Sequence, residues 1–233
     1  EKLLTANKAD ATVVTALFKI YALTGNSAAS LELVNNADTN GKAPELFFSK
    51  YLVLLANQKP LPVREDPTAT LLPQPEYIPI LDKIATSVPL LEQADKKLLG
   101  LTNISYDLIQ AGYYELALPF TNQMVTENKF FDKGYLYRGI ILSHSGIYPE
   151  AEQDITTALQ YKSDSINTYI LLYEVKSALA KHEELPALTD KIKELYQDND
   201  QNMIWELLKI TDKFALYQEG ADLLAYFQAK LNN

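Results

Sequence analysis

The sequence predicts an all-α fold built from repeated pairs of helices, and three observations support it. Turn-like segments recur at a fixed interval, because Gly112 and Gly146 are 34 residues apart. After the second turn, Ala151, Ile155 and Ala158 follow the spacing of one helix face. The composition, 47% hydrophobic and 22% charged, is that of an ordinary globular chain. Helix pairs at this period are typical of units that stack to bury a shared core.

The turn Gly-x-Tyr-x-x-Ala at a 34-residue interval resembles the tetratricopeptide repeat, a helix–turn–helix unit. The segment 132–165 carries the fullest match. Tyr135 stands where the family prefers Trp, whereas Arg138 replaces the usual Leu and Ser163 replaces the closing Pro. Gly139 is in register, and its small size is expected to let two helices approach closely. The resemblance implies an all-α, right-handed α-solenoid of about six helix hairpins.

The register extends in both directions, so the whole chain, 1–233, is predicted to form a single solenoid. Gly25 is the expected turn glycine of the first unit, and Trp205 falls at the family's preferred Trp position in the last. A two-residue insertion in the turn 181–184 accounts for a longer interval in the fifth unit. Pro119 is expected to kink or shorten a second helix. The predicted units are 11–44, 45–97, 98–131, 132–165, 166–201 and 202–233.

Prolines concentrate in the second unit, where six of the eleven lie between 60 and 79. Proline at this density prevents regular helix. We therefore expect an insertion at about 59–77 between the two helices of that unit. It either crosses the concave groove or contacts a neighbouring domain, or it is a passive surface loop.

In such repeats the first helices line a concave side, which is the usual partner surface. Most positions that helical spacing places there are apolar or neutral. The alternative for Leu136, Ile140 and Ile170 is packing against adjacent repeats. The predicted groove residues are Leu99, Thr102, Tyr106, Ile109, Gln110, Lys133, Leu136, Ile140, Ser143, His144, Asn167, Ile170 and Glu174, with Ser177 and Ala178 at the end of the fifth unit's helix.

One subclass of the family grips the C-terminal carboxylate of chaperone tails with Lys and Asn side chains. The matching positions here lack that clamp, so a hydrophobic or extended peptide, or a helix, is the favoured ligand. Those positions hold Thr102, Tyr106, Leu136, Ile140, Ile170 and Glu174.

Residue types that carry chemistry are scarce, and the sequence predicts no enzyme, no cofactor and no metal. The two histidines are His144 and His182, and Ser143 points about 100° away from its neighbour His144 on a helix. Zinc needs three or four His or Cys ligands. The stretch 36–41 resembles the start of a calcium loop, but Phe47 occupies the twelfth place, so we favour a polar turn.

Charge and apolar patterning exclude two further partner classes. The net charge is −9 and the chain has two Arg, which argues against nucleic-acid binding. Apolar runs fall short of the ~20 residues that span a bilayer, so no direct membrane insertion is expected in this fragment. The start at Glu1 suggests a cut or processed chain. The absence of Cys slightly favours an extracytoplasmic place, periplasmic or cell-surface, and leaves a cytoplasmic one open.

Together these features predict a non-catalytic interaction and scaffolding module that binds a partner protein or peptide segment in its concave groove. The alternative is a structural spacer or oligomerisation domain of a larger, membrane-anchored envelope protein. Self-association would favour that alternative.

Overall fold

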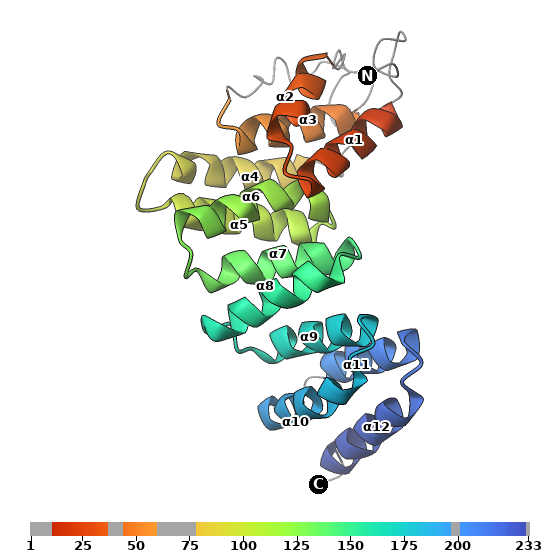
Figure 1. The fold of residues 1–233 in the computed structure, drawn as a ribbon. Coiled ribbons are helices and arrows are strands. Elements are labelled where there is room, and N and C mark those ends of the chain that lie inside the picture. Colours follow the sequence, from red (N-terminus) through yellow and green to blue (C-terminus); the bar gives the residue numbers. More distant parts are fainter. Residues whose placement is uncertain (1–10, 37–43, 60–77, 197–200, 232–233) are drawn as a thin grey trace. The chain divides into compact units, whose positions relative to one another are not determined.

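The computed structural model describes residues 11–36, 44–59, 78–196 and 201–231, and these form helices joined by short turns (Figure 1). The predicted all-α, helical-repeat fold class is confirmed, because the described residues contain helices and no strand. The helices are α1 (Ala11–Leu23), α2 (Ser27–Asn36), α3 (Pro44–Ala56), α4 (Ile78–Leu91), α5 (Lys97–Gln110), α6 (Tyr114–Glu127), α7 (Asp132–His144), α8 (Tyr148–Gln160), α9 (Ile166–Ala178), a 3-10 helix η1 (His182–Glu184), α10 (Leu185–Leu195), α11 (Gln201–Lys213) and α12 (Tyr217–Leu231).

The six odd-numbered helices end in the same hydrogen-bonded turn, and this is how the repeat appears in the backbone. After α7, the N–H of Gly146 donates to the carbonyl of Ser143, and the next N–H donates to the carbonyl of Leu142. This pair of bonds closes a helix end when one residue adopts positive φ. The same pair follows α1, α3, α5, α9 and α11, and it also follows α8, where Lys162 has positive φ. The positive-φ residues of the six turns are Gly25, Gln58, Gly112, Gly146, Ala180 and Ala215.

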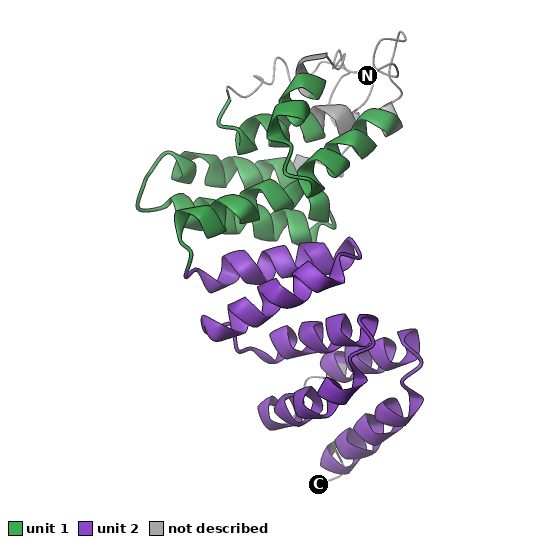
Figure 2. Cartoon of the chain, in the orientation of Figure 1, with its two compact units in different colours: residues 1–129 green, residues 130–233 purple. Residues whose placement is uncertain are grey.

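The chain divides into two compact units, residues 1–129 and 130–233, which Figure 2 distinguishes by colour. In the second unit, α7 packs along α8, α9 packs against α8 and α10, and α11 packs against α12. Gly139 lies where α7 and α8 approach, because a Cβ there would be 2.7 Å from Cγ1 of Ile155. Tyr173 and Phe227 are among the fully buried side chains of the core that α9–α12 share.

In the first unit, α5 packs between α4 and α6, while the N-terminal helices gather on α6. The substantial contacts of α3 within the described residues go to α1, α2 and α6, and those of α4 go to α5. Phe48 on α3 packs against Tyr113 with ring centroids 4.9 Å apart, and Gln123 on α6 donates to the carbonyl of Ala56 at 2.7 Å. Helix α3 thus packs mainly against helices other than α4, the next helix in the sequence. The long connection between α3 and α4 is consistent with this arrangement.

Two expectations fall outside the described residues. They are the role of the proline-rich insertion, of which 60–77 is not described, and the polar turn at 36–41, of which 37–41 is not described. Pro119 does lie within the described part. It stands inside α6, and the helix runs without interruption from Tyr114 to Glu127, so Pro119 does not shorten it.

Candidate functional site

The predicted groove positions on α5 divide into exposed and buried side chains. Leu99 is 53% exposed and Tyr106 is 49% exposed, and Gln110 is also exposed. Thr102 is buried, and its Oγ1 donates to the carbonyl of Leu98 at 2.6 Å, so that hydroxyl is committed to its own helix. Ile109 is buried as well. The surface that α5 offers is therefore the stripe formed by Leu99, Tyr106 and Gln110.

On α7, the predicted positions form a surface that is polar at both ends. Lys133 and His144 are exposed near the first and last turns. Leu136 and Ile140 between them are half-buried, and Ser143 is buried. Half-buried aliphatic side chains offer less area to a partner than the stripe on α5.

On α9, the predicted positions are largely engaged within the second unit. Ile170 is 5% exposed and belongs to the core that α9–α12 share, which is the packing alternative stated for it above. Glu174 accepts a hydrogen bond from Nζ of Lys213 on α11 at 2.8 Å. Ser177 is buried, and its Oγ donates to the carbonyl of Tyr173. Asn167 is exposed at the start of the helix. A partner on α9 would therefore meet Asn167 and an ion pair.

An aromatic cluster at one end of the α7–α8 hairpin was not expected from the sequence. Phe130 is 74% exposed and packs edge-on against Tyr161, with ring centroids 5.5 Å apart. Tyr161 in turn lies 5.8 Å from Tyr135. The guanidinium of Arg138 lies over Tyr135 and donates two hydrogen bonds to Asp154, at 2.6 and 2.7 Å. The hydrogen bonds that Arg138 donates to Asp154 raise the pKa of the guanidinium, so Arg138 stays charged.

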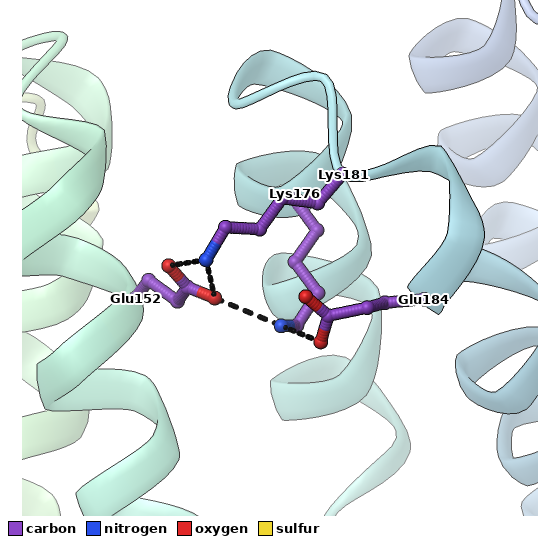
Figure 3. A network of polar contacts seen from close by, with 4 residues as sticks. All are labelled: Glu152, Lys176, Lys181 and Glu184. Carbon is purple, nitrogen blue, oxygen red and sulfur yellow. Dashed lines mark hydrogen bonds and ion pairs between the residues drawn. The ribbon is translucent and has the colours of Figure 1, made fainter.

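A network of four charged side chains fixes the inserted turn after α9 (Figure 3). Nζ of Lys176, on α9, donates to Glu152 of α8 at 2.8 Å and to Glu184 of η1 at 2.5 Å. Lys181 donates to both carboxylate oxygens of Glu152, at 2.8 and 2.7 Å. Lys176 is 8% exposed, and a buried ammonium needs such partners. The network therefore holds the turn that the two-residue insertion creates.

Opposing causes set the protonation of this network. Burial acts to raise the pKa of Glu152, but hydrogen bonds from Lys176 and Lys181 outweigh it and lower that pKa. Burial acts to lower the pKa of Lys176, but the hydrogen bonds that it donates to Glu152 and Glu184 outweigh burial and raise that pKa. Glu152 and Lys176 are therefore both charged at neutral pH. Two lysines and two glutamates thus form a structural clamp that joins α8, α9 and η1.

In the part of the chain that the structure describes, no group of three or more His, Cys, Asp or Glu side chains could hold a metal ion. Within the same residues, no helix has the length and apolar character to cross a bilayer.

The fold defines a class, a protein of stacked helix pairs, and comparisons with known proteins add little beyond it. No family model matches the chain, and no curated protein matches it. Two solved structures of MamA are similar in part, one from MSR-1 and one from AMB-1. The first is 14% identical with a TM-score of 0.43, and the alignment covers 79% of this chain and 95% of that one. The second is 15% identical with a TM-score of 0.42, covering 79% and 98%.

Proposed function

We propose that the chain is a non-catalytic interaction and scaffolding module that binds an apolar or extended segment of a partner protein on exposed faces of its first helices. One observation carries the proposal. Leu99 and Tyr106 lie two turns apart on one face of α5, and about half of each side chain is exposed. On the opposite face, Leu101, Ile104 and Leu108 are fully buried. The helix is thus fixed by one face and presents apolar surface on the other.

The physical basis of binding is burial of that stripe. Each Å² of apolar surface removed from water contributes about 25 cal/mol, and a Tyr gives a large contact area for the loss of few side-chain torsions. A small number of such anchors carries most of the affinity in typical interfaces. Because α5 packs on both α4 and α6, the stripe is held in place before a partner arrives.

In-cell photo-crosslinking tests the proposal. A photoreactive phenylalanine analogue replaces Tyr106 in the full chain, and a matched chain carries it in place of Tyr217, which is 69% exposed on α12. We expect a discrete cross-linked partner from position 106 that is absent from position 217. The same band is expected to disappear when Leu99→Asp is added, since a charge at that exposed position opposes apolar contact without disturbing the core.

The other outcomes are equally informative. Cross-links from position 106 that join only two copies of this chain would support the spacer or oligomerisation alternative. Identical bands from both positions, or a band that persists with Leu99→Asp, would contradict the assignment of the α5 face.

A further inference from the structure

A cavity of about 260 Å³ lies within the first unit. Its lining includes no residue of α5, so it is separate from the stripe of Leu99, Tyr106 and Gln110. It is lined by α1, the α1–α2 turn, the first turn of α2, α3 and its C-terminal turn, and α6. Its deepest side chains are Phe18, Leu52 and Leu116, which are 1%, 2% and 6% exposed. Around the mouth are Ser27 and Thr126, both exposed. The cavity therefore has an apolar floor and a polar rim.

All fifteen lining residues of the cavity are uncharged. The chain as a whole is 22% charged and has a net charge of −9, so this neutrality distinguishes the cavity from the rest of the surface. A charged group placed there would lose water without gaining an ionic partner, which is costly. The lining therefore selects for an uncharged occupant.

Two carboxamides at the rim are held in fixed orientations. Nε2 of Gln123 donates to the carbonyl of Ala56 at 2.7 Å, and Nδ2 of Asn57 donates to the carbonyl of Val53 at 2.8 Å. Each amide nitrogen carries a second N–H, and each amide oxygen is an acceptor. A side-chain amide has the same donor and acceptor as a peptide group. Fixed amides beside an apolar floor thus suit a ligand that combines an apolar side chain with peptide groups.

The volume of the cavity limits the size of the side chain that it can hold. An apolar cavity of about 150 Å³ is enough to hold benzene. The cavity here is larger than that, yet it lies below the range of about 300–1,000 Å³ that whole small-molecule ligands occupy. One aromatic or large aliphatic side chain fits this space better than a complete cofactor does.

We propose that this cavity binds one uncharged apolar side chain, preferably aromatic, of a partner peptide whose backbone groups pair with Asn57 and Gln123. The inference rests on the proposed function in that the ligand is a peptide. It concerns a different surface, formed by α1, α2, α3 and α6, so the two proposals can fail separately.

The test titrates capped tripeptides into the full ¹⁵N-labelled chain and follows amide chemical shifts. The probes are acetyl-Ala-Phe-Ala-amide and its counterparts with Glu or Lys in the middle. We expect saturable shifts at α1, α3 and α6 with the Phe peptide, at millimolar dissociation constants, and at least about tenfold weaker binding of both charged peptides. Absence of saturation with the Phe peptide, or equal binding of all three, would overturn the proposal.

Two variants and a control locate the site. Ala56→Leu adds bulk to the cavity wall and is expected to weaken binding of the Phe peptide about tenfold. Ala85→Leu makes the same change at an exposed position of α4 outside the cavity, and should bind as the unmodified chain does. Asn57→Asp places a carboxylate at the rim, so it should weaken the Phe peptide and strengthen the Lys peptide. Equal binding of the Phe peptide by Ala56→Leu and Ala85→Leu would contradict the assignment of the binding site to this cavity. If a variant fails to fold, the chemical-shift changes in the unmodified chain show whether the peptide binds at the cavity.

Discussion

The close approach of α7 and α8 leads to a prediction whose sign depends on a second residue. Gly139 is buried in the middle of α7, and a Cβ there would lie 2.7 Å from Cγ1 of Ile155 and 3.4 Å from the carbonyl oxygen of Ala151. Real Cβ atoms do not approach another carbon to 2.7 Å. Because Ile155 is fully buried, it has no free space into which to move. Gly139→Ala therefore forces the two helices apart or drives Ile155 out of its rotamer.

Two opposing effects set the change in the free energy of unfolding that Gly139→Ala causes. Ala is favoured over Gly inside a helix by about 1 kcal/mol. Overpacking a filled core costs about 1–3 kcal/mol. The net expectation for Gly139→Ala is a loss of about 1 kcal/mol in the free energy of unfolding. Ile155→Ala removes the atom that clashes, so in that background the same Gly139→Ala change is expected to gain about 1 kcal/mol.

Urea unfolding of four chains measures this coupling, with circular dichroism as the signal. The chains are the unmodified one, each single variant and the double variant. The expected coupling between positions 139 and 155 is about 2 kcal/mol, within the range seen for residues in contact. If Gly139→Ala has the same effect in both backgrounds, the helices are not held together at this glycine and the reasoning is refuted.

Three further predictions concern the second unit. Tyr173→Phe should raise the free energy of unfolding by about 1 kcal/mol in urea, because the Tyr173 hydroxyl is buried without a hydrogen-bond partner in the described part of the chain; a loss of stability would contradict this. Ala180→Gly should raise the melting temperature, since Ala180 has a φ of 55° and non-glycine residues lose about 1–2 kcal/mol in that region; an unchanged or lower value would contradict it. The ion pairs of Glu152, whose pKa is lowered, stabilise the fold above the ordinary carboxyl pKa and are lost as pH falls below about 4. Those of Lys176, whose pKa is raised, are present below the ordinary ammonium pKa and are lost only as pH rises beyond about 10. Glu152→Gln should flatten the acid limb of a stability–pH profile, and an unaltered limb would count against the network.

Local features of the fold were predictable because they depend on residues close in sequence. Gly25, Gly112 and Gly146 were recognised as turn residues, and each has positive φ. The sequence does not predict the equivalent turns at Ala180 and Ala215, since an alanine carries no signal for that conformation. The interval from Gly146 to Ala180 is again 34 residues, so the insertion comes after the turn residue and forms η1.

Features that depend on distant parts of the chain were not predictable in the same way. Helices α1 and α3 pack on α6 although both lie far from it in the sequence, and the repeat period contains no information about such contacts. The candidate groove shows the same limit. Helical spacing placed Leu99 and Ile170 on equivalent faces, yet one is 53% exposed and the other 5%. The difference arises from neighbouring helices, because Ile170 is covered by the core of α9–α12.

The most direct test of the central claim is the affinity of a captured segment for the α5 face. The segment cross-linked at position 106 is synthesised as a peptide and titrated calorimetrically into the unmodified chain, the Leu99→Asp variant and a Leu224→Asp control, in which a 39% exposed Leu of α12 is changed. We predict that Leu99→Asp weakens binding by about tenfold or more, which corresponds to about 1.4 kcal/mol, while the control binds as the unmodified chain does. Equal dissociation constants for all three chains would contradict the claim that the α5 stripe is a partner-binding surface.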